Sequence, residues 1–166
     1  MVASGGYGQS RATLKGTYLL ILRIDDDLTD LTIGQLGRFH FAAGYYLYIG
    51  SAFGPGGLST QLQHFEQPGR TRPRRHIDYL RPHTHLVEAW GVGSGAPVGC
   101  HWAHALAATQ EVSIPVPRFS VRNRCRSHLL YVARRPTLRL LTETLLSCFA
   151  QEQDQDLTLE IRDYND

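Results

Sequence analysis

Lysine, cysteine and long apolar runs are scarce in this chain of 166 residues. It has a single lysine, Lys15, beside sixteen arginines, and its three cysteines stand at positions 100, 125 and 148. No apolar run approaches the ~20 residues that cross a bilayer, so we expect no membrane association. The first ten residues lack the basic start and apolar stretch of a secretory signal. Cysteines that are few, odd in number and widely spaced favour reduced thiols, which predicts a cytoplasmic protein.

Positive charge is concentrated in the middle of the sequence, although the net charge is only +2. Residues 31–141 hold thirteen arginines and four acidic residues, a net charge of +9. The last 25 residues hold seven acidic residues and one arginine, a net charge of −6. The planar guanidinium of arginine suits phosphate and stacks on bases, which favours a nucleic-acid partner. The alternative is a solvated face in a protein from a genome that prefers arginine codons.

The pattern of apolar residues predicts a mixed α/β fold of the α+β type. Residues 16–24 form an aliphatic run of strand length, and residues 45–49 form a second strand rich in tyrosine. Leu58, Leu62 and Phe65 then recur at i, i+4 and i+7, the apolar stripe of an amphipathic helix. The order of these elements predicts a small, mainly antiparallel central sheet flanked by helices.

The domain organisation expected from the sequence is simple. Residues 1–14 are expected to be disordered, residues 15–150 to form one domain, and residues 151–166 to form an acidic tail. A chain of this size can bury a hydrophobic core within a single domain. The acidic tail is interpreted either as a solubilising end or as an internal competitor for the basic face.

Five short motifs stand in a fixed order along the chain. They are "GTY" at 16–18, "GYYLYIGSAFGPGGL" at 44–58, "HIDYL" at 76–80, "GCHWAHAL" at 99–106 and "CRSHLLYV" at 125–132. Together they resemble the GIY-YIG nuclease superfamily, in its Uri-type branch, over about 115 residues. The resemblance implies hydrolysis of a DNA phosphodiester assisted by one divalent metal, Mg²⁺ or Mn²⁺. A protein that does not cleave would need no cofactor.

The resemblance also implies roles for particular residues. Tyr18 and Tyr48 match the tyrosines that position or deprotonate the attacking water. Gln61 and His76 complete the candidate catalytic set, and the metal ligand is unknown. The candidate DNA-binding residues follow the second tyrosine and the first helix: Gly50, Ser51, Gly57, Arg70, Arg72, Arg74 and Arg75.

The chain departs from the family pattern at the two most demanding catalytic positions. Gln61 stands where the family carries an arginine, and Gly99 stands where it carries a glutamate that holds the metal. A glutamine can donate a hydrogen bond but brings no charge, and a glycine brings no side chain. Arg75 and Glu88 are candidates to take over the two roles.

Three functional hypotheses remain open on the sequence. The first is a protein that binds the DNA phosphate backbone with cleavage weakened or lost. The second is an active metal-dependent DNA endonuclease with a shifted catalytic set. The third is a non-enzymatic protein-interaction domain whose arginines face an acidic partner. His101 and His104, one turn apart beside Cys100, could bind a transition metal, but ordinary helix histidines are the favoured interpretation.

Overall fold

A five-stranded antiparallel sheet forms the centre of the protein in the computed structural model, which describes residues 14–67, 72–93, 97–120, 125–147 and 158–164. The strand order is β6-β4-β1-β5-β7. The strands are β1 (Gly16–Ile24), β4 (Gly44–Ala52), β5 (His85–Gly93), β6 (Leu129–Val132) and β7 (Thr158–Asp163). The predicted α+β fold with a mainly antiparallel sheet is therefore confirmed.

Strand β1 lies in the middle of the sheet because its side chains are apolar on both faces. Tyr18, Leu20 and Leu22 point into one buried core, whereas Leu19 and Ile21 point into the other. Alternate residues of a strand face opposite sides of its sheet, so a strand that is apolar throughout needs cover on both sides. The continuous aliphatic run in the sequence thus specifies a central position.

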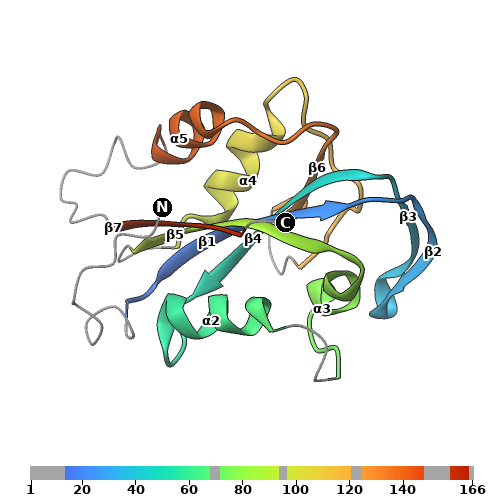
Figure 1. Ribbon diagram of the computed structural model, residues 1–166, viewed down its shortest axis with the longest axis horizontal. Coiled ribbons are helices and arrows are strands. Elements are labelled where there is room, and N and C mark those ends of the chain that lie inside the picture. Colours follow the sequence, from blue (N-terminus) through green and yellow to red (C-terminus); the bar gives the residue numbers. More distant parts are fainter. Residues whose placement is uncertain (1–13, 68–71, 94–96, 121–124, 148–157, 165–166) are drawn as a thin grey trace.

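Two pairs of helices provide this cover, one on each face of the sheet (Figure 1). α2 (Gly57–Glu66) and α3 (His76–Leu80) lie on the face of Tyr18, and α4 (Gly99–Ala107) and α5 (Leu138–Ser147) lie on the other. The stripe predicted for the first helix is confirmed, because Leu58, Leu62 and Phe65 are all buried in α2. The predicted flanking of the sheet by helices is confirmed as well.

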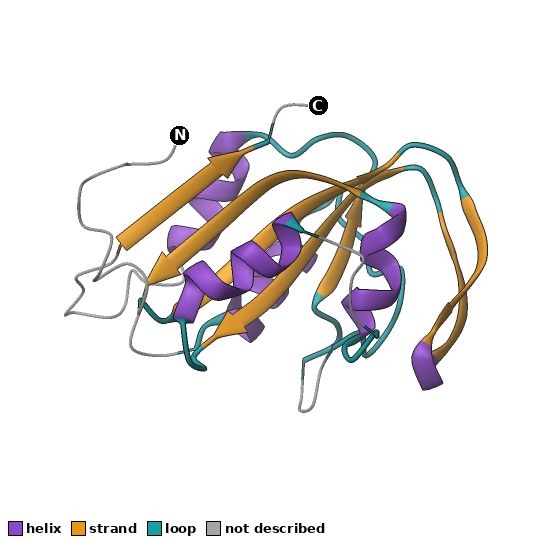
Figure 2. Cartoon of the chain, turned by 60° about the horizontal axis from the view of Figure 1, so that its bottom comes forward, coloured by secondary structure: helices purple, strands orange, loops and turns teal. Residues whose placement is uncertain are grey.

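A two-stranded ribbon extends from one end of the main sheet (Figure 2). It consists of β2 (Leu28–Ile33) and β3 (Gly37–Phe41), joined by the short 3-10 helix η1 (Gly34–Leu36). Its apolar residues Ile33 and Phe41 are buried in the same core as Tyr18. A second 3-10 helix, η2 (Arg81–His83), follows α3. No helix of the described residues is long and apolar enough to span a membrane.

The segment expected to be an acidic tail contributes a strand to the sheet. Residues 158–163 form β7, which pairs with β5 over six residues. Leu159 and Ile161 pack against the core on the α4 side, while Glu160 and Arg162 alternate with them. Apolar and charged residues thus alternate along the segment, which is the pattern of a half-buried strand. A count of net charge over the last 25 residues does not reveal this pattern. Residues 1–13, where disorder was expected, lie outside the described residues.

Candidate functional site

The pairing of β1 with β4 brings the two motif tyrosines together. Tyr18 lies opposite Gly50, and Tyr48 precedes Gly50 by two residues, so both side chains emerge on the same face of the sheet. Their ring centroids are 6.3 Å apart. Phe65 of α2 packs against both rings, at 5.7 Å from Tyr18 and 6.1 Å from Tyr48. The strand register through the two motifs therefore creates one aromatic cluster.

Gly50 provides the space for the phenol of Tyr18. A β-carbon placed on Gly50 would overlap the outer end of the Tyr18 ring, including its hydroxyl. Any side chain at this position would have to displace the tyrosine from its place in the core. The glycine of the second motif and the tyrosine of the first are thus two parts of one packing arrangement.

Tyr18 and Tyr48 both line a cavity of about 480 Å³ beside the sheet. Burial raises the pKa of Tyr18 well above its usual value, Tyr48 raises it further, and Arg75 lowers it. Burial likewise raises the pKa of Tyr48. The Tyr18 hydroxyl has no hydrogen-bond partner among the described residues. Near neutral pH the two phenols are therefore protonated.

Arg75 places a cation at the rim of this cavity. Its guanidinium lies 5.0 Å from the centre of the Phe65 ring and donates a hydrogen bond of 3.1 Å to the side-chain oxygen of Gln61. Asp78 supports the segment by accepting hydrogen bonds of 2.9 Å from the backbone amides of Arg74 and Arg75. Gln61, at the position where an arginine was expected, thus holds the arginine of another segment in place.

His76 enters the cavity with a defined tautomer. Its Nδ1 accepts a hydrogen bond of 2.8 Å from the backbone amide of Ser120, so the proton of the neutral ring lies on Nε2. Burial lowers the pKa of His76, which favours this neutral form. With its proton on Nε2, His76 is therefore positioned as a hydrogen-bond donor rather than as a base.

The loop that contacts His76 has an unusual backbone. Arg118 and Ser120 have φ angles of 64° and 56°, in the left-handed region that costs non-glycine residues energy.

Most of the predicted site residues meet at two adjoining cavities. The first is lined by Tyr18, Tyr48, Gly50, Ser51, Arg74, Arg75 and His76 together with Ile49, Ser120 and His128. The second, of about 430 Å³, is lined by Gln61, Arg72, Arg74 and Arg75 together with Thr60, His64 and Asp78. Gly57 is buried at the start of α2 and lines neither cavity. Arg70 lies outside the described residues.

A comparison with models of protein families matches residues 17–151 to the family described as "Domain of unknown function DUF123". The chain belongs to this family. No curated protein and no solved structure matches the chain. The matched range contains the strands and helices from β1 to α5, apart from Gly16, and ends before β7. The whole tyrosine cavity therefore lies within the DUF123 region.

The residues of the DUF123 cavity do not fit the Mg²⁺ or Mn²⁺ ion that the sequence resemblance implies. These ions take oxygen ligands, and carboxylates are their usual protein anchors. None of the described residues that line the first cavity is an aspartate or a glutamate. Glu88, a candidate for this role, instead lies 3.9 Å from the guanidinium of Arg135. We therefore derive no step through a metal at this position.

Gly99 is one reason why the first cavity lacks a carboxylate ligand. It is the first residue of α4, and a β-carbon placed on it would lie 3.4 Å from Ile49 and 3.8 Å from His128, two residues that line the cavity. A side chain at position 99 would therefore point toward the cavity without a severe overlap. Position 99 therefore has room for a β-carbon beside two residues that line the cavity.

Sequence reasoning missed two features near this cavity. Ser120 and His128 line it, and the only available signal was that His128 lies within the "CRSHLLYV" motif. Ser127, next to His128, is buried; its hydroxyl donates to the carbonyl of Val116 at 2.8 Å and accepts from the amide of Leu129 at 3.1 Å, so it is not free to act as a nucleophile. Its role is to hold the turn that leads into β6.

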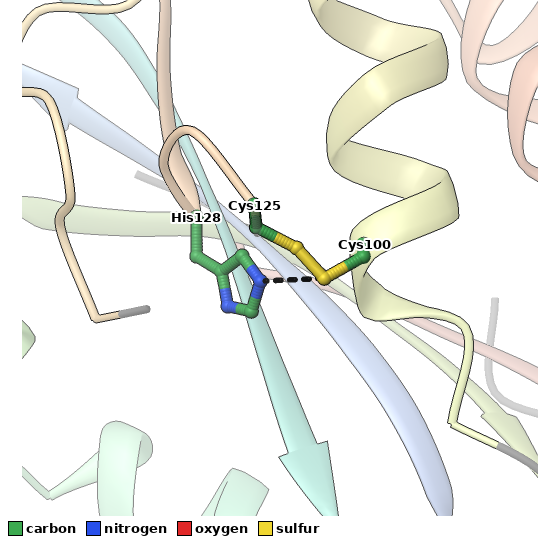
Figure 3. Close-up of side chains that lie close together, drawn as sticks. All are labelled: Cys100, Cys125 and His128. Carbon is green, nitrogen blue, oxygen red and sulfur yellow. Dashed lines mark hydrogen bonds between the residues drawn. A yellow bond between two sulfur atoms is a disulfide. The ribbon is translucent and has the colours of Figure 1, made fainter. Parts of the chain in front are cut away.

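The cysteines also differ from the expectation of reduced thiols. Cys100 and Cys125, 25 residues apart in sequence, are joined by a disulfide (Figure 3). His128 lies against this pair, with its Nε2 3.9 Å from the sulfur of Cys100. Spacing alone could not indicate the pair, because the two cysteines meet only when α4 packs beside the turn before β6. Cys148 lies outside the described residues.

Proposed function

We propose that this DUF123 domain binds the phosphate backbone of nucleic acid, DNA in particular, and cleaves it weakly or not at all. The observation that carries the proposal is the position of Arg74 and Arg75, which border both cavities beside the two tyrosines. DUF123 is also a family related to the Uri-type GIY-YIG proteins. Arginine forks are well suited to phosphate oxygens because they donate two parallel hydrogen bonds.

The described side chains give each part of a phosphate group a partner. Arg75 supplies positive charge, held in place by Gln61 and Phe65. His76 can donate from Nε2, and the protonated phenol of Tyr48 can donate from its hydroxyl, whereas the Tyr18 hydroxyl is buried behind it. A phosphodiester offers only acceptor oxygens to such groups, so three donors around one cavity are complementary to it.

The same residues are poorly suited to cleavage. A phenol whose pKa is raised by burial stays protonated near neutral pH and provides almost no phenolate to act as a base, and Nδ1 of His76 is occupied by the amide of Ser120. Removal of one donor that acts in the transition state typically costs ~10²–10³ in rate. Because position 61 is a glutamine and position 99 is a glycine, we expect the protein to bind DNA but to cleave it weakly or not at all.

The first test is a titration of DNA binding against salt. We expect the protein to bind duplex DNA, and the double variant Arg74→Ala/Arg75→Ala to bind more weakly. For B-DNA, the slope of log K against log salt should become shallower by about 0.9 for each phosphate that the variant no longer neutralises, or about 2 for the pair. Binding constants measured by fluorescence anisotropy at several salt concentrations give this slope.

The matched control is Arg139→Ala, which removes an exposed arginine on α5, across the sheet from the cavities. This variant should keep the slope of the unmodified protein, and circular dichroism should show all three proteins folded. An unchanged affinity and slope in the double variant would contradict the proposal. That outcome would favour the protein-interaction hypothesis, in which the arginines face an acidic partner.

The second test concerns cleavage. We expect little or no cut product from a panel of duplex, branched and single-stranded DNA with Mg²⁺ or Mn²⁺. The double variant Gln61→Arg/Gly99→Glu should raise cleavage measurably. It introduces a charged donor and a carboxylate at the two positions where this chain differs from the family pattern. Adding Tyr48→Phe to this variant should lower cleavage again. Gel assays of product against time measure all three.

Two controls separate site chemistry from added charge. Gln63→Arg adds an arginine on an exposed part of the same helix, and Gly99→Gln adds a side chain of similar size without charge. Neither should raise cleavage. Vigorous cleavage by the unmodified protein that Tyr18→Phe or Tyr48→Phe abolishes would refute the claim of weakened catalysis. DNA binding would then remain, and the second functional hypothesis would replace the first.

A further inference from the structure

Three side chains that bind transition metals well converge beside the tyrosine cavity. They are Cys100 near the start of α4 and Cys125 and His128 in the turn before β6 (Figure 3). One ligand atom of each lies within 4.8 Å of the other two. Among the described residues this is the only group of three or more such side chains that meets this limit.

The surrounding backbone fixes the positions of these ligands. The amide of Ile49 donates to the carbonyl of His128 at 2.9 Å, and the amide of His128 donates to the carbonyl of Phe119 at 2.9 Å. The Ser127 hydroxyl also donates to the carbonyl of Val116 and accepts from the amide of Leu129. The cluster therefore rests on β4 and on a tightly bonded turn, which suits a ligand site that must keep its geometry.

The chemistry of this donor set selects a class of metal. Two thiolates and one imidazole are soft or borderline ligands, which favour Zn²⁺ and similar ions over Mg²⁺. Two sulfurs and one nitrogen leave the fourth position of a tetrahedral ion open. The oxygen-binding ions that the sequence resemblance implies are excluded from this set by ligand type.

We propose that Cys100, Cys125 and His128 bind one zinc-type ion when the cysteines are reduced, and that the disulfide is the metal-free form of the same site. Both states use the same two sulfur atoms, so they exclude each other. Reduction breaks the S–S bond. An external thiol supplies two electrons and two protons and becomes a disulfide, whereas a phosphine supplies two electrons and becomes its oxide, with the oxygen and the two protons coming from water. Zn²⁺ then replaces the two thiol protons, which pass to solvent.

His128 links this site to the tyrosine cavity. Its ring contacts Cys100 through Nε2, and the same residue lines the cavity that contains Tyr48. Metal binding through Nε2 would hold the imidazole neutral and fix its orientation. The proposal does not depend on nucleic-acid binding, since the three ligands are defined by their own geometry.

The decisive experiment uses the unmodified full chain in both redox states. The protein is reduced with a phosphine, dialysed against Zn²⁺ without oxygen, and analysed for bound metal. We expect about one Zn²⁺ per chain in the reduced protein, none in the disulfide form, and tighter binding as the pH rises, because thiol protons are released. Co²⁺ in place of Zn²⁺ should give the charge-transfer absorption of a thiolate complex.

Single substitutions identify which residues bind the Zn²⁺ ion. Cys100→Ser and His128→Gln should each weaken Zn²⁺ binding by more than the ~10–100-fold that loss of an outer-sphere partner costs. Cys148→Ser and His101→Gln are the controls and should bind Zn²⁺ as the unmodified protein does. Three outcomes would overturn the proposal: no Zn²⁺ on the reduced protein, equal binding by the disulfide form, or an equal loss in the controls. The first two need only the unmodified protein, so a variant that fails to fold leaves the test intact.

Discussion

Tyr18 keeps its position because Gly50, directly opposite on β4, has no side chain. The phenol fills the space that a β-carbon would need, and it is completely buried. Arg75 and Gln61 show the same interdependence, since the guanidinium is held by a side chain from another helix. At the scale of single residues, Tyr18 and Arg75 are thus each positioned by one neighbouring residue of another strand or helix.

Gly50→Ala is expected to destabilise the protein by about 1–3 kcal/mol, the usual cost of forcing extra atoms into a packed core. The matched control is Gly54→Ala in the loop that follows β4, where a β-carbon would meet no atom within 4 Å. That change should alter the free energy of unfolding by less than about 1 kcal/mol. Urea denaturation of both variants measures the difference.

A double-mutant cycle identifies the cause of the loss. In a Tyr18→Leu background the outer end of the ring is gone, so Gly50→Ala should cost less than it does beside the tyrosine. An equal cost in the two backgrounds would show that the glycine is needed for another reason, and the packing explanation would then fail.

Among the elements, β7 is the one that the sequence pattern did not indicate, since residues 151–166 were described only as an acidic tail. The strand is joined to α2 by polar contacts. Arg162 donates to Glu66 at 2.8 Å and to Glu160 at 2.6 Å, and the Tyr164 hydroxyl also donates to Glu66. Glu66 is therefore the acceptor that ties the edge of the sheet to the helix covering it.

Glu66→Gln is expected to lower the free energy of unfolding by about 1–3 kcal/mol, since hydrogen bonds to charged groups contribute about that much. The matched control is Glu143→Gln, which breaks an exposed ion pair with Arg139 on α5. Exposed pairs of this kind contribute about 0–1 kcal/mol. Thermal or urea unfolding compares the two variants, and equal losses would mean that the contact of Glu66 with β7 adds nothing.

At the scale of the whole molecule, the sequence predicted what depends on local pattern. The aliphatic run of β1, the stripe of α2 and the two tyrosine motifs all depend on residues close together in the chain. The central sheet and the meeting of Tyr18 with Tyr48 followed from them. The partners of Gln61 and Cys100 did not, because Arg75 and Cys125 reach them only through packing between distant segments.

The central position of β1 also determines the order in which this protein can fold. Gly16 pairs with Ala52 on one side and with Gly93 on the other, and β7 then pairs with residues at least 65 positions earlier. Contacts this distant in sequence make folding slow, because long loops must close before the contacts form. During synthesis, β1 and β4 can pair early, but the sheet is complete only after the ribosome has released residues 158–163. Until then β5 exposes an unpaired edge to other chains.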